Sequence, residues 1–142
     1  MHPLAHTGLV AVAFVLGTGQ VVAAADVVAV VSSKSAITRL TPRQVEDIFL
    51  GRINHLGRGT KLVPLDLPER SPVRADFYAT FGGKSPAQLR AHWSKLIFTG
   101  RGQPPAVVSD SETARKRVAT NPNAIAYMDR SAVDASVRIV AP

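Results

Sequence analysis

The sequence predicts an α/β fold, with a mixed or largely parallel sheet of about four or five strands flanked by helices. Apolar, β-branched segments alternate along the chain with amphipathic segments, and each amphipathic segment opens on a residue type that caps helices. Hydrophobic residues make up 46% of the 142 residues and charged residues 19%. This is ordinary globular composition, and the length leaves room for a single domain.

Five segments have the composition of strands. The first, 26–31, is a continuous apolar run, which is typical of a strand buried on both faces. The segment 61–67 contains Pro64, which predicts an edge position or a bend because proline cannot donate to a strand ladder. The other expected strands are 106–108, 124–128 and 137–140.

Four helices are expected to begin near Thr41, Ser71, Ser85 and Asp110. In three of them the third helical position carries an acceptor that can bond back to the N-cap N–H and close a capping box. These acceptors are Gln44, Gln88 and Glu112. In the helix that begins near Ser85, the apolar side chains expected to face the core are Leu89, Trp93, Leu96 and Ile97.

The helix that begins at Ser71 differs from the others, because its third position is Arg74. Arginine offers five donors and no acceptor, so this helix end stays rich in donors. A serine hydroxyl, free backbone N–H groups and an arginine fork together favour an oxyanion site. The alternative is an ordinary serine N-cap with a solvent-facing arginine. If the site exists, Arg74→Gln is expected to weaken anion binding and leave folding intact, because glutamine can close the capping box.

The first 25 residues have the pattern of a secretory signal peptide. They contain no Lys, Arg, Asp or Glu, and their apolar stretch, 8–16, is shorter than the roughly 20 residues that span a bilayer. The small residues of 23–25 form a cleavage site before Asp26. We therefore expect a mature domain of 26–142 in the periplasm or outside the cell. An uncleaved membrane anchor is the alternative.

Composition excludes several classes of chemistry. The chain has no cysteine, so disulfides, thiol catalysis and cysteine-ligated metals are ruled out. His55 and His92 lack partners at metal-ligand spacing, and no catalytic motif is present. We therefore expect a protein that is not an enzyme and needs no cofactor or metal. The net charge of +7 favours anionic partners, although an exported protein without an aromatic-rich basic platform is not expected to bind nucleic acid.

Short motifs in a fixed order resemble those of the phosphate-binding proteins of phosphate ABC transporters. The segment 40–51, from Leu-Thr-Pro to Ile-Phe-Leu-Gly, resembles that family's "LT…IFxGK" segment. Ser71-Pro72-Val73-Arg74 stands where the family carries Ser-Gly-Thr-Arg, its phosphate motif. Further similarities follow in the same order, at Trp93, 98–100, 104–105 and 121–127. The resemblance covers 27–140.

The resemblance implies an exported, short, single-lobe member of the type 2 periplasmic-binding-protein-like superfamily. It implies that the Ser71 hydroxyl and the Arg74 guanidinium contact phosphate or a similar oxyanion, and that the loop 32–35, with Ser33, approaches the same edge of the sheet. It also implies a transporter permease or an envelope or sensor protein as partner.

The sequence departs from the family pattern where Pro72 and Val73 replace Gly-Thr, and the chain has room for one lobe where the family uses two. The alternative function is a ligand-free module that docks through its basic surface to an envelope protein or an anionic polymer.

Overall fold

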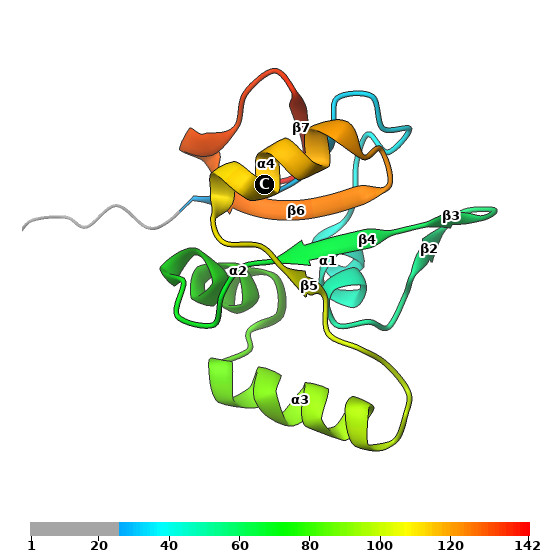
Figure 1. The fold of residues 1–142 in the computed structure, drawn as a ribbon, viewed down its shortest axis with the longest axis vertical. Coiled ribbons are helices and arrows are strands. Elements are labelled where there is room, and N and C mark those ends of the chain that lie inside the picture. Colours follow the sequence, from blue (N-terminus) through cyan, green and yellow to red (C-terminus); the bar gives the residue numbers. More distant parts are fainter. Residues whose placement is uncertain (1–25) are drawn as a thin grey trace, which may run out of the picture.

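The computed structural model describes residues 26–142 (Figure 1). The predicted signal segment, 1–25, lies outside the described residues. The strands are β1 (Val27–Ser32), β2 (His55–Leu56), β3 (Thr60–Lys61), β4 (Val63–Asp66), β5 (Ala106–Val107), β6 (Ala124–Asp129) and β7 (Val137–Ala141). The helices are α1 (Pro42–Phe49), α2 (Pro72–Gly82), α3 (Pro86–Phe98), α4 (Ser111–Thr120) and the short 3-10 turn η1 (Arg130–Ala132). The predicted α/β class and the four predicted helix starts are confirmed.

Five strands form one mixed sheet in the order β5-β4-β6-β1-β7, and β2 and β3 form a separate hairpin. Strand β4 runs parallel to β5 and β6, whereas β1 runs antiparallel to β6 and β7. Every residue of β1 is buried, as expected for a continuous apolar strand in the interior of a sheet. The carboxyl ends of β4 and β6 therefore lie at one edge of the sheet, and the carboxyl end of β1 lies at the opposite edge.

Pro64 lies in a strand that has neighbours on both sides, so the expected edge position of this strand is wrong. However, β5 pairs only with Leu65 and Asp66, which leaves the β5 side of β4 open at Pro64. The proline is tolerated because the sheet is locally narrower at that residue.

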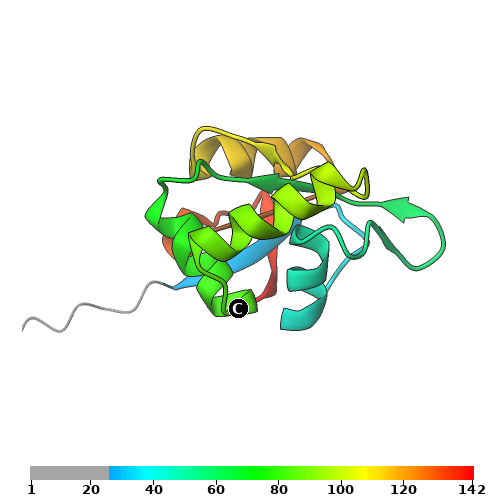
Figure 2. The same ribbon diagram turned by 90° about the horizontal axis from the view of Figure 1, so that it is seen from below.

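Helices cover both faces of the sheet. Helix α4 packs on β6, β1 and β7, while α1 and α2 pack against each other on the other face, where α2 contacts β1 and β6 (Figures 1 and 2). The apolar core lies between these layers and includes most of β1 and β6. Within residues 26–142, no helix combines the length and hydropathy needed to cross a bilayer.

The helix caps follow the sequence with one exception. Thr41 and Ser85 close the predicted capping boxes with Gln44 and Gln88. In α4 the N-cap is Asp110, whose carboxylate accepts a bond from the N–H of Thr113 at 2.8 Å. The third helical position is therefore Thr113, one residue later than expected. Glu112 does not close a capping box and instead forms an ion pair with Lys116, one turn along the helix.

Helix α3 lies at the end of the molecule, away from the sheet faces (Figure 1). Trp93 is its main anchor and is 6% exposed. Gly51, just after α1, has φ +71°, and a Cβ atom at this position would lie 3.1 Å from Cη2 of Trp93. Glycine therefore serves two purposes here, because it allows the left-handed turn and admits the indole ring.

We predict that Gly51→Ala destabilises the protein more than Gly57→Ala. Gly57 also has positive φ, +61°, but a Cβ there would meet nothing within 4 Å. Both changes should cost about 1 kcal/mol for the backbone conformation, and Gly51→Ala should cost roughly 1 kcal/mol more for the crowded indole. Denaturant unfolding measures both values. Equal losses would show that Trp93 does not pack over Gly51.

Candidate oxyanion site at the end of strand β4

The candidate site lies where the chain leaves β4 and enters α2. Asp66 is the last residue of β4, and Ser71 is the N-cap of α2, five residues later. In open α/β sheets, ligands bind beyond the carboxyl ends of the strands, near helix N-termini. The β4–α2 junction is such a position.

The carboxylate of Asp66 is the most buried charged group in the described chain, with an exposed fraction of 3% for the residue. Its Oδ1 accepts bonds from the N–H of Leu67 at 2.9 Å and from the hydroxyl of Tyr127, and its Oδ2 accepts a bond from the hydroxyl of Tyr78 at 2.9 Å. A buried charge is stable only when it is paired and hydrogen-bonded, so these donors are necessary to the fold.

Arg74 supplies the positive charge that pairs with Asp66. Its Nε lies 3.3 Å from Oδ1 and 3.4 Å from Oδ2 of the carboxylate, and its side chain is only 13% exposed. The guanidinium carbon also lies 5.0 Å from the ring centroid of Tyr78, within the range of a cation–π contact. Arg74 is thus an internal partner of Asp66, and the alternative of a solvent-facing arginine is wrong.

This pairing corrects the expectation that Arg74→Gln leaves folding intact. Glutamine would remove the cation beside Asp66 and leave a buried carboxylate without its counter-charge. Breaking a buried ion pair in this way typically costs about 3–5 kcal/mol, which exceeds the gain from one capping box.

Only part of the Arg74 guanidinium is used by this contact. Among residues 26–142, no hydrogen bond is formed by either terminal nitrogen, Nη1 or Nη2. The hydroxyl oxygen of Ser71 accepts a 3.3 Å bond from the backbone N–H of Arg74, which leaves the hydroxyl proton to be donated elsewhere. Pro72 has no N–H, and the N–H of Val73 lies in the first turn, where helices have no internal acceptor.

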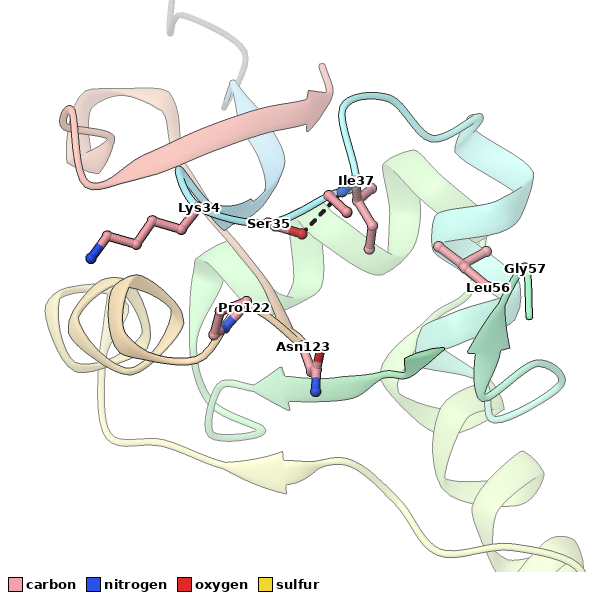
Figure 3. Close-up of a pocket in the computed structure, with 8 residues that line it drawn as sticks. Lys34, Ser35, Ile37, Leu56, Gly57, Pro122 and Asn123 are labelled. Carbon is pink, nitrogen blue, oxygen red and sulfur yellow. Dashed lines mark hydrogen bonds between the residues drawn. The ribbon is translucent and has the colours of Figure 1, made fainter. Parts of the chain in front are cut away.

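The structure does not bring Ser33 to this site. Ser33 follows β1, whose carboxyl end lies beside Ile125 near the start of β6, whereas Asp66 lies at the opposite end of the parallel strands. The expectation that the loop 32–35 approaches the same edge is therefore wrong, because β1 runs antiparallel to β6. Lys34 and Ser35, which follow Ser33, border a cavity separate from the start of α2, and Asn123 lies on the other side of that cavity (Figure 3).

A cluster of packed aromatic rings includes Tyr127, one of the donors to Asp66. The rings of Phe77 and Tyr127 are stacked, with centroids 3.9 Å apart, and Phe49 packs edge-on against both. The start of α2 is recognisable in the sequence, whereas the contributions of Asp66 and Tyr78 to the site were not predicted from it. A carboxylate within an otherwise apolar strand was the available signal, because such a group must find donors when it is buried.

Burial raises the pKa of both Tyr78 and Tyr127, and the negative charge of Asp66, to which they donate, raises each pKa further. The two hydroxyls therefore stay protonated and act as donors. Within residues 26–142, no group of three His, Asp or Glu side chains could hold a metal ion.

No protein-family model matches the sequence, and no curated protein matches it. Solved structures do match. The chain is similar to a putative phosphate ABC transporter substrate-binding protein with bound phosphate from Clostridium perfringens, with a TM-score of 0.64 and 24% identity over 82% of this chain and 44% of that one.

An ABC-type phosphate transport receptor from Vibrio cholerae gives a TM-score of 0.64 at 20% identity, over 82% and 46% of the two chains. PstS from Borrelia burgdorferi gives 0.55 at 13% identity, over 82% and 47%. The chain has the fold of a periplasmic-binding-protein lobe. This lobe spans less than half the length of each of these proteins, and the identities show the fold alone.

The two tyrosines of the site give a direct test, because the chain contains no others. Their ordinary pKa is 10.0, and both are raised in the folded lobe. Above pH 10 the unfolded chain loses phenolic protons that the folded chain keeps. Stability should therefore be unaffected by these groups below pH 10 and should fall above it, by about 1.4 kcal/mol per pH unit for each tyrosine.

The ultraviolet absorbance of tyrosinate should appear only together with unfolding, which circular dichroism follows in the same samples. A phenolate signal near pH 10 from protein that remains folded would show that the two hydroxyls are not buried donors to Asp66.

Proposed function

We propose that this protein is an exported, non-catalytic binding protein that takes phosphate or a similar oxyanion at the start of α2. One observation carries the proposal: Asp66 holds Arg74 through Nε, and neither terminal nitrogen forms a hydrogen bond within residues 26–142. These nitrogens belong to the same helix start as the Ser71 hydroxyl and the free N–H of Val73.

Each group has a distinct role toward the ion. The two terminal nitrogens of Arg74 form a fork that matches two oxygens of a tetrahedral anion. The hydroxyl of Ser71 and the N–H of Val73 donate to further oxygens, and the positive end of the α2 dipole adds to the attraction. Asp66 fixes the orientation of the guanidinium, which favours the hydrogen bonds to the anion. Its negative charge also weakens the attraction between the anion and Arg74.

The fold likeness supports this class of ligand, since one of the similar structures contains bound phosphate. For a binding protein of this class, the proposed partner is a transporter permease or an envelope or sensor protein. The proposed location is the periplasm or the outside of the cell. Dissolved salt screens the charges of an exposed site, so anion binding by residues 26–142 should decrease as salt is added.

The proposal predicts that Ser71→Ala weakens phosphate and sulfate binding, whereas Ser85→Ala does not. Both changes remove a serine N-cap whose hydroxyl oxygen accepts from the third helical N–H, so both should cost about 1 kcal/mol of stability. Arg74→Lys should also weaken binding, because lysine can pair with Asp66 but offers no fork. Calorimetric titration at low and moderate salt measures binding.

Equal binding by the Ser71→Ala and Ser85→Ala variants would place the ion elsewhere. If the unaltered protein binds no anion at millimolar concentration, the oxyanion function is absent from this lobe.

A further inference from the structure

A second candidate site lies between the turn that follows α1 and helix α3. A cavity of about 480 Å³ is bordered by Leu96 and by three cations, Arg52, Lys95 and Arg101. A second cavity of about 210 Å³ shares Gly51 and Arg101 with the first. The two cavities adjoin at these shared residues, and we call them together the α1–α3 groove.

The charge of this groove is positive. No carboxylate borders the larger cavity, and the segment 77–109 contains no Asp or Glu. Arg52 is paired with Glu46 and Asp47, each at 3.2 Å. Lys95 and Arg101 form no ion pair within the described residues, so their charges remain available to a partner.

Exposed apolar side chains stand next to these cations. Phe98, the last residue of α3, is 92% exposed, and Ile97 is 50% exposed. The expectation that Ile97 faces the core is therefore wrong, because α3 lies against the turn after α1 and only one of its faces is covered. Large exposed apolar residues are typical of protein interaction sites, in which aromatic anchors carry much of the binding energy.

We propose that the α1–α3 groove docks an acidic segment of a partner protein, in which carboxylates alternate with apolar side chains. The carboxylates pair with Lys95 and Arg101, while the apolar side chains pack on the half-buried Leu96 and the exposed Phe98. Charge complementarity selects this occupant, since the groove holds the unpaired cations Lys95 and Arg101 and no carboxylate borders its larger cavity.

Two other occupants fit less well. A second copy of this chain would bring a protein of net charge +7 against the same positive surface, and like charges disfavour such association. An anionic membrane is flat and could contact Phe98, but it would not fill a cavity that continues past Arg101. Helix α3 forms one end of the molecule (Figure 1).

The test uses the protein labelled with nitrogen-15 and a short synthetic peptide of alternating glutamate and leucine. We expect the peptide to shift the amide resonances of Gly51, Leu96 and Arg101 and to leave those of Ser71 and Val73 unchanged. The Lys95→Gln/Arg101→Gln variant should bind the peptide about 2- to 30-fold more weakly, which is the range for losing two exposed ion pairs. Phe98→Ser should weaken binding separately.

The matched control is Arg39→Gln/Arg117→Gln, which removes the same charge from two exposed residues that form no ion pair within residues 26–142. This variant should bind the peptide as tightly as the unaltered protein does. The Ser71→Ala variant should also bind the peptide normally, and this result would separate the groove from the oxyanion site. A peptide of alternating glutamine and leucine should not bind.

Four results would overturn the proposal. Equal losses in both double variants would mean that only net charge matters. Binding of phosphatidylglycerol vesicles but not of the peptide would assign Phe98 to a membrane. Concentration-dependent dimers that Phe98→Ser abolishes would assign the surface to a second copy, and absence of peptide binding would leave the groove without an acidic occupant.

Discussion

The buried carboxylate of Asp66 is the constraint on which the site depends. A charge at this depth must be matched by donors, and they come from three elements: the N–H of Leu67 after β4, the hydroxyl of Tyr127 on β6, and Arg74 and Tyr78 on α2. The carboxylate therefore fixes the start of α2 against the sheet. The position of the Ser71 hydroxyl and of the terminal nitrogens of Arg74 follows from this attachment.

The same arginine is thus used for folding and proposed for binding. Its Nε belongs to the interior, and only its terminal nitrogens remain for an anion, so a change at Arg74 alters stability and affinity together. The α1–α3 groove has a different character, because its cations lie on the surface and Lys95 and Arg101 are not tied to the fold by any ion pair among residues 26–142. The proposed anion site and the proposed docking surface therefore lie on different elements, one at the start of α2 and the other along α3.

Much of the fold could be predicted from local patterns. Continuous apolar runs marked β1 and β6, and serine, threonine or aspartate marked each helix start, because these signals act within a few residues. The donor-rich start of α2 was also visible, since arginine replaces an acceptor there. The partner of Arg74 was not visible, because strand pairing brings Asp66 to Tyr127, which is 61 positions away in the sequence. For the same reason Ser33 was placed at the wrong edge: sequence patterns do not show that β1 runs antiparallel to β6.

A double-mutant cycle on Asp66 and Arg74 tests this account most directly. Asp66→Asn, Arg74→Gln and the double variant would each be unfolded in denaturant, and their free energies of unfolding compared with that of the unaltered protein. Each single change should cost about 3–5 kcal/mol, and the double change should cost less than their sum by roughly 1–3 kcal/mol, since each single variant leaves an unpaired charge. Additive losses, within about 0.5 kcal/mol, would contradict the claim that this pair holds α2 to the sheet.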